Sequence, residues 1–320
     1  GDTRPRIMSD AVLATSTVTN KVIVNLLLIG LGYLIKRVGL VSRDEGKVLN
    51  RIVLYVTLPA MNLRVISETE LSWELLALPI VMFLAGLLMS RVGHWRGATA
   101  HLSRQDLGTF VVSFCGVMAS LAYPFAEAGF GAEGVSTVAI SDLGNAIVIF
   151  ALAYSLSFRY SESNSFNRRQ ILRKVVTFFP LHAFLLAVVL NLVCVDVCGL
   201  PGGMIDALAG MNSPLMLLGL GIYLEINVSR SERKVILTQM IWKYGVGALV
   251  AAFILLALPF RGPTRAVAFL LPLMPTSLST LLYSVEQDLS PRLAAQLISL
   301  TMIVSLVITT VVTLGFREAF

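Results

Sequence analysis

Two side chains that can carry charge, Asp142 and Lys243, lie far inside long apolar stretches of the sequence. A charge at such depth in a bilayer is costly and usually serves a function. At 1.5 Å per residue we expect the two groups about 12 Å and about 13 Å from opposite membrane boundaries, leaving a gap of about 5 Å that a lysine side chain can close. We therefore predict an Asp142–Lys243 ion pair, structural or serving ion coupling, with Asn145 one turn from Asp142 on the same helix face.

Two prolines inside apolar stretches, Pro124 and Pro275, mark a second kind of candidate chemistry. Proline removes a backbone donor and frees a carbonyl, which lipid cannot satisfy, so such a break persists only where protein or a water-filled cavity supplies partners. The half-helix that starts at a break offers N–H groups and a positive dipole end to an anion. The side chains beside the breaks that can bond a carboxylate are Ser120, Tyr123, Thr276, Ser277 and Ser279. We predict an anion-binding site there, although any one hydroxyl could instead bond a carbonyl of its own helix.

The composition indicates which environment positions these residues. Of the 320 residues, 56% are hydrophobic and 14% are charged, against about 25% charged in an ordinary soluble domain. Together with a mean hydropathy of +0.80, this excludes a soluble enzyme and predicts an all-α integral membrane protein. Apolar runs bounded by charges predict ten transmembrane helices, at 18–37, 46–66, 74–92, 107–126, 134–158, 174–194, 204–226, 234–258, 264–286 and 292–316.

Proline positions recur along the chain and indicate an internal repeat. Pro59 and Pro214 in the second and seventh spans, like Pro124 and Pro275 in the fourth and ninth, are about 150–155 residues apart, and the starts of other spans keep a similar offset. Because each half then holds five spans, an odd number, the second half must be inverted in the membrane. We therefore predict two inverted five-helix repeats in which helices four and nine are broken and cross.

This repeat divides the chain into four predicted parts. They are a non-cytoplasmic N-terminal tail at 1–17, the first five-helix repeat at 18–158, a short cytoplasmic linker at 159–173, and the inverted second repeat at 174–316. Most of the 25 Lys and Arg residues fall in loops on the linker side. Because basic residues concentrate on the cytoplasmic side, we predict that both termini of this multi-pass protein face away from the cytoplasm, in a plasma or inner membrane.

Several other kinds of function are disfavoured by what the sequence lacks. It contains no P-loop and no hydrolase motif, so we predict no enzymatic activity. The stretch 129–134 fits a dinucleotide-binding glycine pattern, but no strand is expected before it and it lies between two predicted spans. Three cysteines and three scattered histidines give no metal-ligand spacing. We therefore expect no cofactor and no metal, and because topology explains the basic excess, no nucleic-acid partner.

Four segments carry a family resemblance: residues 49–60, Asp142–Asn145, Ser213–Leu215 with Leu218 and Gly219, and Met274–Thr276 with the run to Ser305. In order and spacing they resemble the auxin efflux carrier family of membrane transport proteins, over most of residues 18–316. The resemblance implies a dimerising scaffold of spans 1, 2, 6 and 7, a moving transport unit of spans 3–5 and 8–10, and an elevator-like cycle around the crossing breaks. The short linker resembles bacterial or compact members.

We therefore predict a homodimeric secondary carrier in the lipid bilayer that moves a small organic anion, such as an auxin-like acid or a mono- or dicarboxylic acid. Two alternatives stay open. One is a cation- or proton-coupled symporter or antiporter of the same fold, with Asp142 binding the ion. The other is a non-transporting membrane receptor or scaffold, because Val117 and Ala122 stand where family members often place asparagine and glycine.

Overall fold

The computed structural model describes residues 4–67, 69, 72–100, 102–161, 169, 173, 176, 179–193, 199–224 and 232–318. Within these ranges every element is a helix, and the one β-type contact is an isolated antiparallel bridge between Val117 and Thr276. The helices there that are long and apolar enough to cross a membrane number six: Thr17–Arg37, Trp73–Ala98, Ala119–Tyr160, Leu200–Tyr223, Arg233–Ala257 and Pro291–Gly315. The all-α membrane fold is confirmed, and the count of ten spans stays a prediction.

The first half of the chain alternates long helices with short interruptions. Its elements are α1 (Arg4–Arg37), α2 (Arg43–Ile52), the π-helix η1 (Val53–Thr57), α3 (Leu58–Ser67), α4 (Trp73–Ala98), α5 (Arg104–Val112), α6 (Ala119–Ile147), the π-helix η2 (Val148–Ala153) and α7 (Tyr154–Tyr160). Because α1 begins at Arg4, most of the predicted tail continues the first helix. Inside α6, Gly131 has φ 61° and ψ −148°, so the helix turns sharply at the loop predicted for 129–134.

The second half has a similar succession of elements. They are α9 (Phe179–Leu192), α10 (Gly199–Tyr223), α11 (Arg233–Ala257), α12 (Gly262–Leu270), the 3₁₀-helix η3 (Leu271–Leu273), α13 (Ser279–Glu286) and α14 (Pro291–Glu318). The predicted linker at 159–173 and the first residues of the predicted span at 174–194 lie largely outside the described residues.

Serine side chains cap the N-termini of three helices, α2, α4 and α5. Ser42 and Glu45 form a capping box at α2, in which each side chain bonds the backbone N–H of the other residue, at 3.2 Å and 2.7 Å. These bonds hold the pKa of the Glu45 carboxyl below its usual value. Ser72 and Ser103 accept from N–H groups in the first turns of α4 and α5 in the same way.

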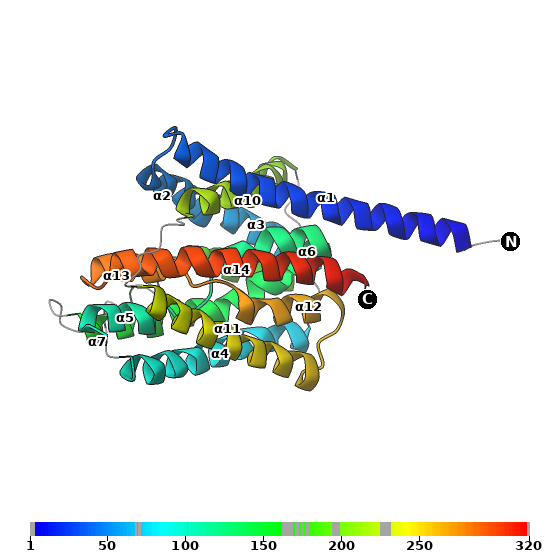
Figure 1. Cartoon of the computed structure of the whole chain (residues 1–320). Helices are drawn as coiled ribbons and strands as arrows, with labels where there is room; N and C mark the ends of the chain where they lie inside the picture. The colour runs from blue at the N-terminus through cyan, green and yellow to red at the C-terminus, as the bar shows by residue number, and fades with distance from the viewer. Residues whose placement is uncertain are drawn as a thin grey trace.

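The helices form two groups, which Figure 1 shows one above the other. In the upper group α1 packs along α10, and α3 packs against α9 and α10. The backbones approach closely at two glycines: a Cβ on Gly32 would lie 2.2 Å from the carbonyl oxygen of Leu218, and one on Gly221 would lie 2.1 Å from that of Ile29. Such close approach at small residues is the usual way in which helices associate in a membrane.

The lower group contains α4, α5, α11, α12 and α14, and α6 packs between it and the upper group. A Cβ on Gly144 of α6 would lie 1.8 Å from the carbonyl oxygen of Pro79 in α4. Two polar contacts join α6 to the upper group. The Asn25 amide donates to the carbonyl oxygen of Pro124 at 3.0 Å, and the Ser213 hydroxyl donates to the Glu127 carboxylate. Side-chain hydrogen bonds therefore join α6 to α1 and α10 in addition to the packing between these helices.

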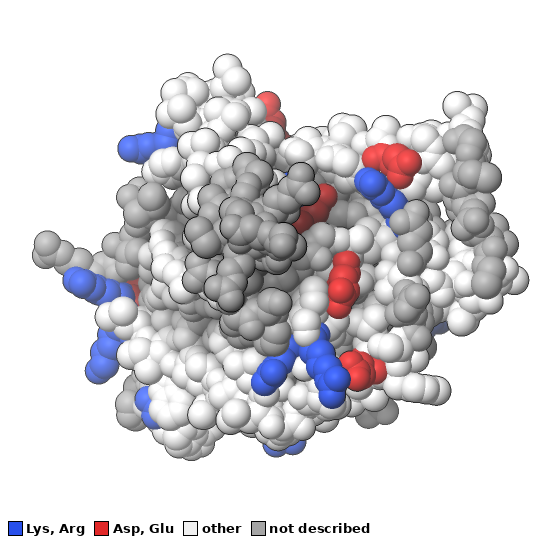
Figure 2. Space-filling model, turned by 90° about the vertical axis from the view of Figure 1, so that its right-hand side faces the viewer, with Lys and Arg blue, Asp and Glu red and all other residues white. Residues whose placement is uncertain are grey.

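The N-terminal end of α1 and the C-terminal end of α14 lie at the same end of the bundle (Figure 1). Figure 2 looks onto that end, where acidic side chains lie among the basic ones. Both signs of charge are thus present on the face that carries the termini.

Candidate functional site

Two non-helical segments interrupt the lower group and contact each other. The first break, residues 113–118, separates α5 from α6, and the second break, residues 274–278, separates η3 from α13. Gly116 has φ +81°, a left-handed conformation that favours glycine. The backbone N–H of Met118 donates to the carbonyl of Pro275 at 2.9 Å, beside the Val117–Thr276 bridge. Each break thus supplies part of the hydrogen bonding that the other lacks.

An amide side chain on α6 holds the first break. Oδ1 of Asn145 accepts from the N–H of Val117 at 2.8 Å, and Nδ2 donates to the carbonyl of Val117 at 3.0 Å. Nδ2 also donates to Oδ1 of Asp142 at 2.7 Å. Asn145 is buried, so its side chain replaces the backbone partner that an intact helix would have given Val117.

Two helices hold the second break through Thr276. Its N–H donates to the hydroxyl of Thr301 on α14 at 3.1 Å, and its own hydroxyl donates to the carbonyl of Ser113 in the first break at 3.2 Å. The amide of Gln239 on α11 donates to the same hydroxyl at 3.2 Å. The Thr276 hydroxyl therefore links the second break to the first break and to α11.

A helix N-terminus follows each break. The first turn of α6 is closed by a bond from the N–H of Leu121 to the carbonyl of Met118, at 3.2 Å, and that of α13 by one from Thr280 to Ser277, at 3.1 Å. The hydroxyls of Ser277 and Ser279 lie 2.7 Å apart, and Ser277 also accepts from the N–H of Ser279 at 3.3 Å. Positive dipole ends of two helices therefore begin beside the contact between the breaks.

The prediction that residues 119–124 form the first break is wrong. These residues make up the first turns of α6, and the break lies before them, at Gly116. Pro124 is the sixth residue of the helix, and its missing N–H leaves only the carbonyl of Ser120 without its helical donor. The carbonyl of Pro124 itself accepts from Asn25. The second break lies in the segment that the sequence predicted, around Pro275.

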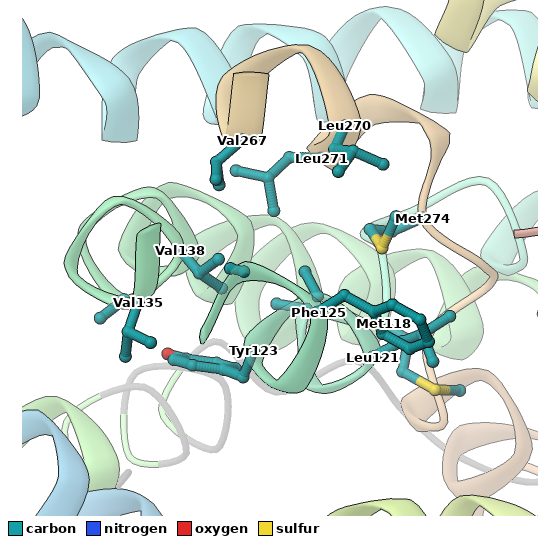
Figure 3. Packing of buried hydrophobic residues seen from close by; sticks show 14 of the residues in the cluster. Met118, Leu121, Tyr123, Phe125, Val135, Val138, Val267, Leu270, Leu271 and Met274 are labelled. Carbon is teal, nitrogen blue, oxygen red and sulfur yellow. The ribbon is translucent and has the colours of Figure 1, made fainter. Parts of the chain in front are cut away.

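Apolar side chains surround the breaks (Figure 3). Met118 at the end of the first break and Met274 at the start of the second belong to one buried cluster, with Leu121 and Phe125 of α6. The Tyr123 side chain is buried and lies beside Val135 (Figure 3). Because water is excluded on this side, a charge near the breaks acts through a low dielectric.

The predicted ion pair between Asp142 and Lys243 is not formed. Asp142 is half-buried and bonds Asn145, whereas Lys243 is fully buried and its Nζ has no hydrogen-bond partner among the described residues. The prediction used the depth of each residue in its span, and depth does not say which way a helix face points. Asp142 on α6 faces Asn145, and α11, which carries Lys243, packs on α4, α12, η3 and α14.

Sequence reasoning missed Gln239 and Thr301, the side chains that hold the second break. A signal for one of them was present, since Thr301 follows Asn145 by about the length of the predicted repeat. The described residues contain no group of three side chains placed to bind a metal ion.

Comparison with known proteins gives a consistent result. A family model described as membrane transport protein matches residues 17–313. The chain is 28% identical over 292 residues to an uncharacterized transporter of Methanothermobacter thermautotrophicus, an alignment that covers 90% of this chain and 95% of the relative. It is 25% identical over 295 residues to an uncharacterized transporter of Methanocaldococcus jannaschii, with the same coverage of both chains.

Proposed function

Because the chain belongs to the membrane transport protein family, we propose that it is a secondary carrier that moves a small organic anion by elevator-like alternating access. The observation that carries this proposal is the contact between two helix breaks, each followed by a helix N-terminus. Such paired N-termini offer N–H groups and positive dipole ends to a carboxylate.

Hydrogen bonds between residues in corresponding positions support the inverted repeat. The Thr57 hydroxyl donates to Oδ1 of Asn212 at 2.9 Å, across a separation of 155 residues, and the Met118–Pro275 bond joins the breaks at a similar separation. Corresponding residues meet in this way where a pseudo-two-fold axis passes between them. We accordingly keep the division at 18–158 and 174–316, with ten spans, as part of the proposal.

A second pair of contacts recurs at the same offset. On one side of the breaks the Ser290 hydroxyl donates to the Asp106 carboxylate, and on the other the Thr264 hydroxyl donates to Glu133 at 3.3 Å. Thr264 follows Asp106, and Ser290 follows Glu133, by about the length of one repeat. These bonds join each half-helix of one repeat to a loop of the other, as crossing helices require.

The side chains of the predicted site then divide into two roles. Ser120, Tyr123, Ser277 and Ser279 are the residues that we assign to the anion, because Ser277 lies in the second break and the other three lie in the first turns of α6 and α13. Pro124, Pro275 and Thr276 shape the backbone instead. The carbonyl of Pro124 bonds α1, and the carbonyl of Pro275 and the hydroxyl of Thr276 bond the first break. The apolar cluster around them would limit the size of the anion.

The two groups of helices support the proposed elevator step. The upper group would be the scaffold through which a homodimer forms, and the lower group with α6 would be the transport unit. Movement of that unit must break the Asn25–Pro124 and Ser213–Glu127 contacts. Termini at one end of the bundle agree with an even number of spans, and the non-cytoplasmic location of both ends stays part of the proposal.

Reconstitution tests the proposal. Purified protein in liposomes would be supplied with labelled monocarboxylates, dicarboxylates and indole acids, with voltage and pH gradients imposed separately. We expect uptake of at least one carboxylate above protein-free liposomes, and a lower uptake after Ser279→Ala. Ser67→Ala, which removes a hydroxyl that bonds only its own helix, is the matched control. Absence of flux for every anion, from folded protein that still binds one, would favour a receptor or scaffold.

Proton coupling is the second candidate function, and one contact favours it. Asp142 accepts from the same Asn145 amide that bonds the backbone of Val117. Protonation of Asp142 would therefore alter the hydrogen bonding at the first break. In that case flux follows the pH gradient in the wild type, and Asp142→Asn abolishes the dependence while leaving a folded protein. Unchanged flux and unchanged pH dependence in Asp142→Asn would remove Asp142 from the mechanism.

A further inference from the structure

Lys243 has no role in the mechanism above. An ionisable side chain inside a membrane-spanning helix is costly, however, and usually has a function. Its side chain has no exposed surface, and its ammonium has no hydrogen-bond partner among the residues described. A buried charge without a partner is strongly unfavourable. The burial of this charge is explained if a negative charge or dipole end lies near the ammonium.

The face of α11 that carries Lys243 runs along the second break. Three residues spaced by four share this face, Gln239, Lys243 and Gly247. Gln239 bonds Thr276, and a Cβ on Gly247 would lie 2.7 Å from the carbonyl oxygen of Pro272. Lys243 stands between these two contacts, and so beside residues 273–275.

Two helix C-termini end at this place. The last turn of α5 ends at Val112, directly before the first break, and η3, which continues α12, ends at Leu273, directly before the second. The last carbonyls of these helices accept from residues of the breaks and from Ser305, and the aligned peptide dipoles still place a partial negative charge at each C-terminus. Because the breaks contact each other, these two negative ends lie near the N-termini of α6 and α13, where they would oppose the binding of an anion.

We propose that Lys243 is the residue that determines charge selectivity: its ammonium offsets the C-terminal ends of α5 and of α12 with η3, leaving the N-termini of α6 and α13 to attract a carboxylate. The inference rests on the proposed function, and it names the part of the site that selects an anion over an uncharged molecule of the same shape. Lys243 acts across the backbone of the second break, as a positioning residue that does not touch the anion.

Variants of Lys243 distinguish a role in charge selectivity from a role in packing alone. Because a buried charge without a partner carries an uncompensated desolvation cost, its replacement by an apolar side chain of similar volume should stabilise the protein. If Lys243 is kept for selectivity, Lys243→Met raises the thermal midpoint of the purified protein while its anion selectivity falls. If Lys243 serves only packing, the midpoint falls and transport of charged and uncharged molecules declines together.

The test compares a carboxylate with its own primary amide in proteoliposomes. The probe is the carboxylate that wild-type protein transports fastest. For Lys243→Met we expect the KM of the carboxylate to rise about tenfold, the effect of about 1.4 kcal/mol, and the KM of the amide to stay within about twofold. Lys243→Arg keeps the charge and should retain most of the selectivity. Lys234→Met changes an exposed lysine on the same helix and is the matched control. An unchanged ratio of carboxylate to amide in Lys243→Met would overturn the inference.

Binding separates failure of the inference from failure of the proposed function. If wild-type protein transports nothing, carrier function fails, and the inference is tested by the shift in thermal midpoint that benzoate produces relative to benzamide at equal ionic strength. A benzoate-specific shift in the wild type that is lost in Lys243→Met supports the inference, and no such shift in the wild type overturns it. Lys243→Gln serves as the second variant if Lys243→Met does not fold, and equal loss for both ligands in Lys243→Gln also overturns it.

Discussion

At the first break one amide, Asn145, bonds both backbone groups of Val117, whereas at the second a hydroxyl, Thr301, bonds only the N–H of Thr276. The second break has two further hydrogen bonds through the Thr276 hydroxyl, which donates to the carbonyl of Ser113 and accepts from the amide of Gln239. The same backbone problem, an interrupted helix among apolar neighbours, is thus solved by different side chains in the two halves. The two breaks therefore share a similar backbone arrangement but are held by different side chains.

The charges near the two breaks differ in sign and in burial. Asp142, half-buried, bonds the amide that holds the first break, and Lys243, fully buried, lies beside the second without a hydrogen-bond partner in the described part of the chain. A half-buried acid can exchange a proton with its surroundings, and a fully buried ammonium can act only through its field. Under the two proposals above, ion coupling would act at the first break and anion selectivity at the second.

Removal of the Asn145 side chain should have the largest effect, because one substitution removes both side-chain bonds to the backbone of Val117. The N–H of Val117 is then left without a partner, while its carbonyl keeps the bond from the N–H of Ala119. For Asn145→Ala we expect a loss of about 2–5 kcal/mol in the free energy of unfolding, measured by denaturation in detergent micelles, together with loss of transport. Asn25→Ala, which removes one bond from an asparagine outside the breaks, should cost less. Equal losses for the two variants would mean that the first break does not depend on Asn145.

The approach of α11 to the second break is the next feature to test. Gly247→Ala places a methyl group 2.7 Å from the carbonyl oxygen of Pro272, which must push the helix away from the break. We expect destabilisation by about 1–3 kcal/mol and reduced flux. Gly245→Ala lies two residues away on the same helix, where an added Cβ meets nothing within 4 Å, and should leave the thermal midpoint unchanged. If both variants behave alike, α11 does not support the break.

Thr301→Val tests the weaker attachment of the second break. Valine has nearly the shape of threonine but leaves the N–H of Thr276 unpaired, so we expect a loss of about 1–2 kcal/mol, smaller than for Asn145→Ala. Thr301→Ser keeps the hydroxyl and should retain most of the stability. Should Thr301→Val cost more than Asn145→Ala in the same denaturation assay, the order of the two attachments would be reversed.

The sequence predicted the features that depend on one helix at a time. Long apolar runs between charges placed α4, α11 and α14 within a few residues, except that α4 continues to Ala98. The second break was found because Pro275 interrupts an apolar run, and the helix ends shortly before it, at Leu273. The first break was placed wrongly because Pro124 was the stronger signal in the sequence, although a helix loses a single bond there and breaks instead at Gly116.

Features that depend on how helices face each other could not be predicted from one sequence. Asp142 and Lys243 were expected to pair because their depths match, but the direction of a side chain around its helix is set by packing. That packing rests on close contacts such as Gly144 against Pro79 and Gly247 against Pro272. The attachment of Thr276 to Gln239 and Thr301 likewise joins residues far apart in the chain. The repeat offset pointed to Thr301, and no comparable signal pointed to Gln239.

The smallest expected difference concerns the hydroxyls that follow the breaks. Ser277 bonds the hydroxyl and the N–H of Ser279 at the start of α13, so Ser277→Ala should cost about 0.5–1 kcal/mol, as the loss of a helix cap does. Ser120, half-buried in the first turn of α6, should change stability by less than about 0.5 kcal/mol when replaced by alanine. If both hydroxyls bind the anion, the two variants raise the KM of the transported carboxylate by similar factors despite unequal stability. A rise confined to Ser277→Ala would instead place the anion at the second break alone, on the side where Lys243 lies.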